Sequence, residues 1–182
     1  MTADATTDPI AETRRWLQRA VIGLNLCPFA KAVAVKSQVR WVLSDAASEP
    51  DLLAALGVEL ALLRDTPPAI VDTTLLIHPQ VFADFYDYND FLGTADALVA
   101  EMDLEGVLQI ASFHPQYRFA GSGEDDIENF SNRSPHPMLH LLREDSVTRA
   151  VAAYPDADAI IGRNMRTLRR LGHDGWRKLF AD

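Results

Sequence analysis

The sequence predicts an α/β fold, with α+β as the alternative, built on a small three- to four-stranded sheet, mixed or parallel, that helices cover. Three short runs at 39–43, 73–77 and 107–113 are rich in β-branched and apolar residues, as strands are. The segments between them, 50–64 and 81–101, repeat apolar residues at helical spacing. Alternation of strands and helices is typical of a sheet built with right-handed crossovers.

Length and composition predict one domain. The chain has 182 residues, of which 48% are hydrophobic and 24% charged, enough for a single buried core. We expect residues 1–8 to form a flexible N-terminus and residues 9–182 a single globular domain. No apolar run reaches membrane-spanning length, and the first residues lack the features of a signal peptide, so we expect a cytoplasmic protein without a membrane partner.

The balance of charge disfavours nucleic acid as a partner. A net charge of −9 is unsuited to displacing counterions from phosphates. The C-terminal segment is a local exception, either a solvated helix face or a docking surface for an acidic partner. Its basic residues are Arg163, Arg166, Arg169, Arg170, Arg177 and Lys178.

Capping signals place the other expected helices. Asp8-Pro9 starts a first helix that runs to about Asn25, and Ser48 with Asp51 starts the helix at 50–64. A polar stretch from 116 to 137 follows the third strand, and its aromatic residues predict an ordered loop. From Pro137 we expect a helix that carries His140 and Glu144 and ends at Pro155, and then a last long helix that stops at Gly172.

The tripeptide His-Pro-Gln occurs twice, at 78–80 and 114–116, and each copy closes a predicted strand. Ligands of open α/β sheets bind outside the carboxyl ends of the strands, so this edge is the expected site. Imidazole and carboxylate groups both move protons and bind metals near neutral pH. We expect His114 and Asp126 as catalytic residues. The expected ligand-binding residues are His78, Asn129, Asn132, Arg133 and Ser134.

Each of these residues also has a purely structural interpretation. A histidine at a strand end can bond a loop carbonyl, and acidic loops are often only solvated. Asn132-Arg133-Ser134 precedes the expected helix at Pro137, which predicts an anion site at a helix N-terminus, or alternatively an N-cap at Ser134 and an ion pair of Arg133 with Asp126. His136 and His140 at i, i+4 offer at best a weak metal motif. We assign no residue to a metal site, and the sequence leaves open which cofactor, if any, the protein uses.

Four separated motifs, in order, resemble a known bacterial family. They are LNLCPFA at 24–30, DFYDYNDFL at 84–92, IASFHPQYRF at 110–119 and NRSPHP at 132–137. From about residue 10 to the C-terminus, the chain resembles the family called domain of unknown function 1415. The resemblance implies a cytosolic bacterial protein and assigns no activity.

The sequence therefore favours a small enzyme or binding protein with a polar pocket for an anionic small molecule. In this hypothesis His114 is the acid or base and Arg133 holds the anion. Whether the protein is an enzyme stays open, as does its oligomeric state. The alternative is a non-catalytic metal-binding or protein-interaction domain that uses the basic C-terminal helix.

Overall fold

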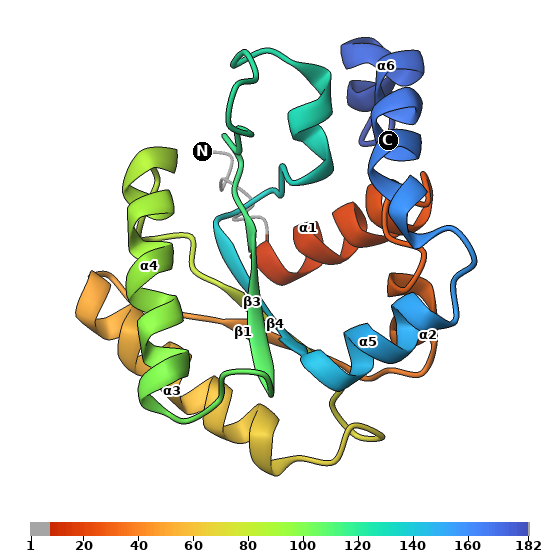
Figure 1. The fold of residues 1–182 in the computed structure, drawn as a ribbon. Helices are drawn as coiled ribbons and strands as arrows, with labels where there is room; N and C mark the ends of the chain where they lie inside the picture. Colours follow the sequence, from red (N-terminus) through yellow and green to blue (C-terminus); the bar gives the residue numbers. More distant parts are fainter. Residues whose placement is uncertain (1–7, 182) are drawn as a thin grey trace.

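The computed structural model describes residues 8–181, which fold around a four-stranded mixed sheet of order β1-β2-β4-β3 (Figure 1). The strands are β1 (Val39–Leu43), β2 (Thr73–Ile77), β3 (Leu108–Phe113) and β4 (Met138–Arg143). β1 and β2 are parallel, and β4 runs antiparallel to both β2 and β3. The expected α/β fold is confirmed.

The alternating middle of the chain follows the prediction closely. β1 and β2 have the expected bounds, and β3 starts one residue later than expected. The helices between them are α3 (Glu49–Asp65) and α4 (Phe85–Glu101), both started by side-chain caps. Ser48 accepts a hydrogen bond from the backbone N–H of Asp51, and Asp84 accepts from that of Tyr86. Because Asp84 is the cap, α4 starts four residues after the expected position.

The expected helix from Pro137 to Pro155 is wrong in its first part, because residues 138–143 form β4. This strand lies between β2 and β3, so both of its edges are bonded and both of its faces lie against protein. A strand covered on two faces carries a continuous apolar run, which periodicity alone does not distinguish from a buried helix. The helix α5 (Glu144–Ala152) starts only after Arg143.

Helices cover both faces of the sheet (Figure 1). α3 and α4 pack on one face, where Leu76, Leu139 and Leu141 join the main core. The other face carries α1 (Pro9–Trp16), which continues into a π-helical turn, η1 (Leu17–Ile22). Trp16 packs there with Leu75, Ile77 and Met138. The predicted first helix is therefore confirmed to Ile22.

Shorter elements and a kinked helix complete the fold. They are α2 (Ala30–Val35), η2 (Ile127–Ser131) within the long polar segment, η3 (Ala157–Ala159) and α6 (Ile160–Lys178). Gly172 has φ 65° and ψ 176°, a conformation that other residues rarely adopt, and it interrupts α6 where the sequence predicted its end. The turn after this kink carries Trp176, which contacts the ring of Phe130 in η2.

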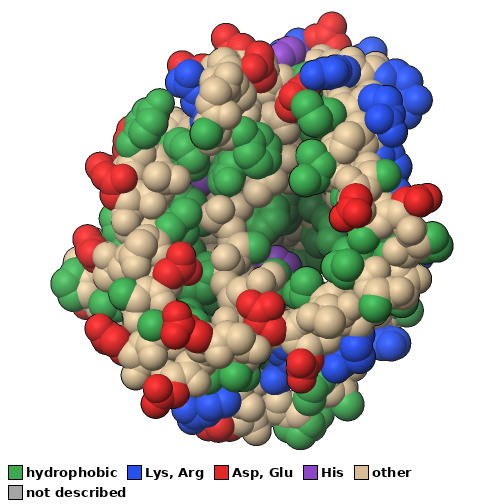
Figure 2. All heavy atoms as spheres, viewed as in Figure 1, with side chains coloured by type: hydrophobic (Ala, Val, Ile, Leu, Met, Phe, Trp, Pro, Cys, Tyr) green, Lys and Arg blue, Asp and Glu red, His purple; other side chains and the backbone are tan. Residues whose placement is uncertain are grey.

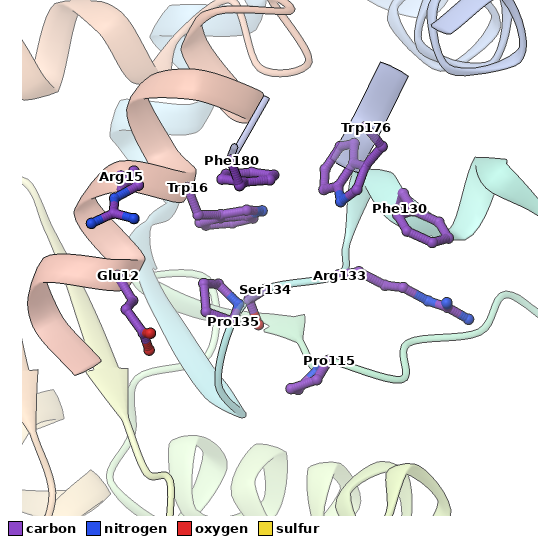
Figure 3. A pocket seen from close by; sticks show the side chains of 10 residues that line it. All are labelled: Glu12, Arg15, Trp16, Pro115, Phe130, Arg133, Ser134, Pro135, Trp176 and Phe180. Carbon is purple, nitrogen blue, oxygen red and sulfur yellow. The ribbon is translucent and has the colours of Figure 1, made fainter. Parts of the chain in front are cut away.

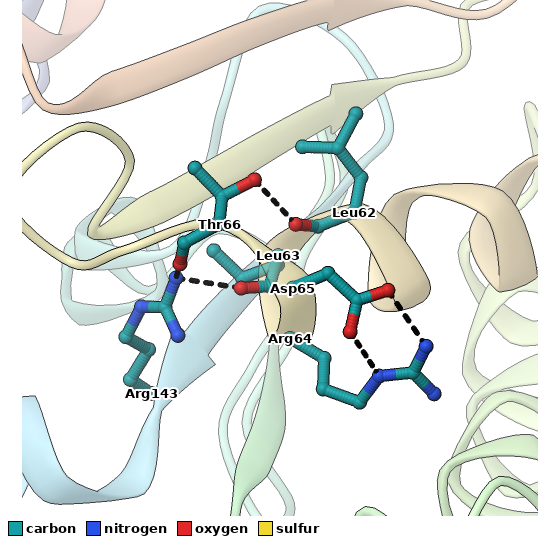
Figure 4. A network of polar contacts seen from close by, with 6 residues as sticks. All are labelled: Leu62, Leu63, Arg64, Asp65, Thr66 and Arg143. Atoms are coloured by element: carbon teal, nitrogen blue, oxygen red, sulfur yellow. Dashed lines mark hydrogen bonds and ion pairs between the residues drawn. The ribbon is translucent and has the colours of Figure 1, made fainter.

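Arg143, the last residue of β4, ties the sheet to the C-terminus of α3 (Figure 4). The two N–H groups of one Nη atom are shared among the carbonyl oxygens of Leu63 at 2.6 Å, Thr66 at 2.5 Å and Val71 at 2.9 Å, and Nε also donates to Val71 at 3.3 Å. The last carbonyls of a helix have no partner within the helix, and a cation is favoured beside them. A single guanidinium group thus satisfies three backbone acceptors.

The expected flexible terminus falls mostly on residues 1–7, which lie outside the described residues. Asp8 caps α1, because its carboxylate accepts a hydrogen bond from the backbone N–H of Ile10 at 3.0 Å. None of the helices within residues 8–181 is long and apolar enough to cross a membrane.

Candidate functional site

His78 and His114 come together at one edge of the sheet, but inside the protein. Both rings contact the ring of Tyr88 from α4, with centroid distances of 5.9 Å for His78 and 5.0 Å for His114. Both side chains are fully buried. The hydroxyl group of Tyr88 donates to the carbonyl of Met138 and accepts from the N–H of Phe113, so it ties together the facing ends of β3 and β4.

Backbone groups hold both nitrogens of His114. Nε2 donates to the carbonyl of Phe82 at 2.9 Å, and Nδ1 accepts from the N–H of Gln116 at 3.0 Å. A ring that donates at one nitrogen and accepts at the other is neutral, and burial lowers the pKa of His114. The side chain that we expected as acid or base therefore supports the loop after β3.

His78 is held in a similar way through one nitrogen. Its Nδ1 donates to the carbonyl of Val81 at 3.2 Å, and its Nε2 is buried with no partner among the described residues. Burial lowers the pKa of His78 to about 4. The ring is therefore neutral at physiological pH.

The polar residues of the long loop mainly bond to the loop itself. The side chain of Asn129 is buried, accepts from the N–H of Phe119 and donates to the carbonyl of Gly123. Asp126 accepts from the N–H of Gly123, and Asn132 donates to the carbonyl of Ser112. These hydrogen bonds explain why a polar segment of this length is ordered. The aromatic residues of the segment had predicted an ordered loop.

An anion site at a helix N-terminus is ruled out after Asn132-Arg133-Ser134, because the strand β4 follows. The hydroxyl group of Ser134 donates to the carbonyl of His136 at 2.6 Å, so it is not a helix cap. His136 and His140 do not share a helix either. Within residues 8–181, no group of three or more His, Cys, Asp or Glu side chains is placed to hold a metal ion.

His140 on β4 donates a hydrogen bond to Thr73 on β2, and the other bond of Thr73 fixes this direction. The hydroxyl group of Thr73 donates to the carbonyl of Leu141, so at 2.6 Å it accepts from Nε2 of His140. Burial lowers the pKa of His140 to about 4. This ring is neutral at physiological pH and holds β4 against β2.

A cavity of about 340 Å³ opens near the carboxyl end of β3, on the face covered by α1 and α6 (Figure 3). Its walls come from α1, the loop after β3, the segment from η2 to β4, and the C-terminal turns. They consist of aromatic rings, prolines and a few charged groups: Glu12, Arg15, Trp16, Pro115, Phe130, Arg133, Ser134, Pro135, Trp176 and Phe180. Figure 2 shows that this side of the molecule is hollowed between α1, α5 and α6 and that hydrophobic side chains line the hollow.

Two of the residues expected at a site line this pocket, namely Arg133 and Ser134. The structure does not bring the others to it: His78, His114, Asp126, Asn129 and Asn132 are not lining residues. The ring of His114 packs on Phe85 and Tyr88, on the α4 side of the sheet. Sequence reasoning missed Glu12, Trp16, Trp176 and Phe180, because apolar spacing on terminal helices indicates core and gives no sign of a pocket.

Arg133 offers a cationic group with spare hydrogen-bonding capacity. Its Nε donates to the carbonyl of Tyr117 at 3.1 Å, one Nη donates to that of Glu124 at 2.6 Å, and its guanidinium group lies 4.6 Å above the centre of the Phe130 ring. The second Nη has no hydrogen-bond partner among residues 8–181. Burial lowers the pKa of Arg133, and the nearby carboxylates of Asp125 and Glu124 raise it. A free N–H donor on a partly buried cation favours an anion.

The aromatic wall is held by contacts that reach across the chain. Trp176 lies 5.2 Å from Phe130 and 5.7 Å from Phe180, measured between ring centres. Arg19 of η1 donates to the carbonyl of Leu179 at 2.9 Å and so fixes the C-terminal turn to the N-terminal helix. The indole N–H of Trp16 is buried without an acceptor among the described residues, and Figure 3 shows this nitrogen turned toward Trp176. Such a donor is stabilised by any acceptor that reaches it.

The other end of the pocket carries both a carboxylate, that of Glu12, and the guanidinium group of Arg15. The carboxylate of Glu12 lies 2.6 Å from Nε2 of His136, which joins α1 to the segment before β4. In Figure 3 this carboxylate and the guanidinium group of Arg133 lie at opposite ends of the pocket. The prolines Pro115 and Pro135 lie between them, opposite the aromatic rings.

Comparison with known proteins gives a family and no activity. A family model described as "Protein of unknown function (DUF1415)" matches residues 8–178, nearly the whole chain. No curated protein and no solved structure matches the chain.

Proposed function

We propose that the protein binds, in this pocket, a small anionic molecule with a flat, ring-like body. The proposal comes from the pocket because the chain belongs to the DUF1415 family, whose description assigns no activity. The observation that carries this proposal is the meeting of four aromatic side chains, Trp16, Phe130, Trp176 and Phe180, with the partly buried guanidinium group of Arg133 in one cavity.

The chemistry of the walls supports this ligand class. Aromatic rings and prolines bury flat apolar surface, whereas the guanidinium group of Arg133 binds an oxyanion through charge-assisted hydrogen bonds. The cavity of about 340 Å³ is near the lower end of the range of small-molecule sites, about 300–1,000 Å³. A ligand of one or two rings with a carboxylate or a similar anion matches these walls.

The alternative of an interaction surface on the basic C-terminal helix is less well supported. Three of its six basic side chains bond to groups of this chain: Arg163 donates to the hydroxyl group of Tyr154, Arg169 pairs with Glu128, and Arg177 pairs with Asp174. The carboxylates of Glu128 and Asp174 reduce the charge that the helix offers to an acidic partner, and the bond to Tyr154 orients the side chain of Arg163 within the protein. The pocket is therefore the better candidate.

Replacing Arg133 by Met tests the proposal, with benzoate and 2-naphthoate as probes. We expect both carboxylates to bind the wild-type protein, and cyclohexanecarboxylate, which is not flat, to bind more weakly. Loss of the cation should weaken binding about tenfold or more, because hydrogen bonds to charged groups contribute about 1.5–3 kcal/mol. Isothermal titration calorimetry measures the three dissociation constants.

Arg118→Met is the matched control. Arg118 lies in the same loop and bonds to the carbonyl of Ser122 and the hydroxyl group of Tyr86, but it does not line the pocket. This variant should bind the probes as the wild-type protein does. Equal losses in the two variants would mean that the loop as a whole, and not the charge of Arg133, controls binding. Absence of binding by both aromatic carboxylates would refute the proposed function.

A further inference from the structure

We propose that the ligand of this pocket is polar at both ends: opposite its anionic group it carries a hydrogen-bond donor, an amino or hydroxyl group, which the carboxylate of Glu12 accepts. The inference rests on the proposed function and narrows its ligand class. It follows from the hydrogen-bond acceptor that Glu12 offers at the end of the pocket opposite Arg133.

The first step is the arrangement of the charged groups. Glu12 lies in the first turn of α1, whereas Arg133 belongs to the segment that links η2 to β4. Figure 3 shows their charged groups at opposite ends of the cavity, with the rings of Trp16, Trp176 and Phe180 along one side between them. A flat molecule that lies along these rings therefore presents one end to a cation and the other end to a carboxylate.

The second step is that Glu12 keeps an unused acceptor. One carboxylate oxygen, Oε2, lies 2.6 Å from Nε2 of His136, and the other oxygen has no hydrogen-bond partner in the part of the chain that the structure describes. The Glu12 side chain is 30% exposed, so a ligand can reach it. A carboxylate oxygen only accepts hydrogen bonds, so the matching ligand group must be a donor.

The third step is that His136 holds this acceptor in place. The residue stands between Pro135 and Pro137, whose rings restrict the backbone, and its carbonyl accepts from the hydroxyl group of Ser134 at 2.6 Å. An imidazole fixed in this way fixes the carboxylate bonded to it, as an orienting partner does in many binding sites. His136 is thus a positioning residue, and Glu12 makes the contact.

The unused acceptor of Glu12 also determines what the pocket rejects. A ligand with a second carboxylate at that end of the pocket offers Glu12 no hydrogen-bond donor. A ligand with an apolar group at that end leaves Glu12 partly desolvated without a new hydrogen bond. The preferred class is therefore an amino- or hydroxy-substituted flat carboxylate.

Three probes of similar shape test this inference: 4-aminobenzoate, 4-methylbenzoate and terephthalate. The wild-type protein should bind 4-aminobenzoate about tenfold more tightly than 4-methylbenzoate, because the amino group donates to a charged acceptor and the methyl group does not. Terephthalate, which has no donor for Glu12, should also bind more weakly than 4-aminobenzoate. Glu12→Met, which replaces the carboxylate by an apolar chain of similar length, should bring the first two dissociation constants together.

Glu49→Met is the control for Glu12→Met. Glu49 is also an acidic residue in the first turn of a helix, α3, but it is exposed and far along the chain from the pocket segments. This variant should keep the wild-type preference. The comparison of the three probes on the wild-type protein does not depend on any variant folding.

The outcomes separate this inference from the proposed function. Equal affinity of the wild-type protein for 4-aminobenzoate and 4-methylbenzoate, together with a loss of both in Arg133→Met, would overturn the inference and leave the proposed function in place. A preference for the amino compound that survives in Glu12→Met would also overturn it, because another group would then accept the donor. Absence of binding by all the aromatic carboxylates would remove both proposals.

Discussion

Replacing Arg143 by Met should lower the free energy of unfolding by about 2–4 kcal/mol, since hydrogen bonds to charged groups contribute about 1.5–3 kcal/mol and several are lost together. Without the guanidinium group, the carbonyls of Leu63, Thr66 and Val71 lose a charged donor at the point where α3 meets the sheet (Figure 4). Urea unfolding measures the change as a lower midpoint with an unchanged slope.

Arg64→Met is the matched control, because Arg64 lies on the same helix end and is drawn in the same network (Figure 4). Its guanidinium group pairs with the carboxylate of the neighbouring Asp65, and both side chains are exposed to solvent. Exposed ion pairs contribute little to stability. A loss of stability in Arg64→Met as large as in Arg143→Met would contradict the role given to Arg143.

Acid should destabilise the protein through its buried neutral histidines. Burial lowers the pKa of both His78 and His140 to about 4, whereas the ordinary value of an unfolded histidine is near 6.5. Between these two values the unfolded chain binds protons that the folded protein does not. Stability is therefore complete above about pH 6.5 and falls as the pH drops toward 4, by about 1.4 kcal/mol per pH unit for each ring.

Two variants separate the contribution of these histidines to the pH dependence of stability from that of carboxylates, which titrate in the same pH range. His140→Gln keeps an amide donor for the hydroxyl group of Thr73, and His78→Gln keeps a donor for the carbonyl of Val81. Each should reduce the slope of stability against pH between 6.5 and 4.5 by the contribution of one ring. His173→Gln, at an exposed position of α6, serves as the control. An unchanged slope in the double variant would contradict the assignment of neutral rings.

The sequence predicts the fold best where local signals and burial agree. β1, β2 and α3 combine β-branched or helical patterns with clear caps, and their bounds are correct or differ by one residue. The prediction is wrong for β4 because its surroundings come from elsewhere in the chain: two strands bond to its edges, and helices cover its faces. Its six residues carry no turn signal and no alternation, so the local pattern resembles a helix.

The candidate site is less predictable for a related reason. Arg133 and Ser134 were expected at a site because they stand in a polar loop at the sheet edge, and both line the pocket. The expected partner His114 turns the other way, since its ring packs beside Tyr88 and bonds to the backbone. Trp16 and Trp176 lie 160 residues apart in the sequence and meet only after the sheet and η2 have placed both terminal helices.

The indole N–H signals of the three tryptophans test most directly whether a flat anion binds in this pocket. Trp16 and Trp176 line it, whereas Trp41 lies on β1 under the guanidinium group of Arg14 and does not. Titration with 4-aminobenzoate in ¹H–¹⁵N spectra, assigned by Trp→Phe variants, should shift the signals of Trp16 and Trp176 in a saturable way and leave that of Trp41 in place. The buried N–H of Trp16 should show the largest shift, because it gains an acceptor. Unchanged signals of Trp16 and Trp176, or an equal shift of all three, would contradict binding in this pocket.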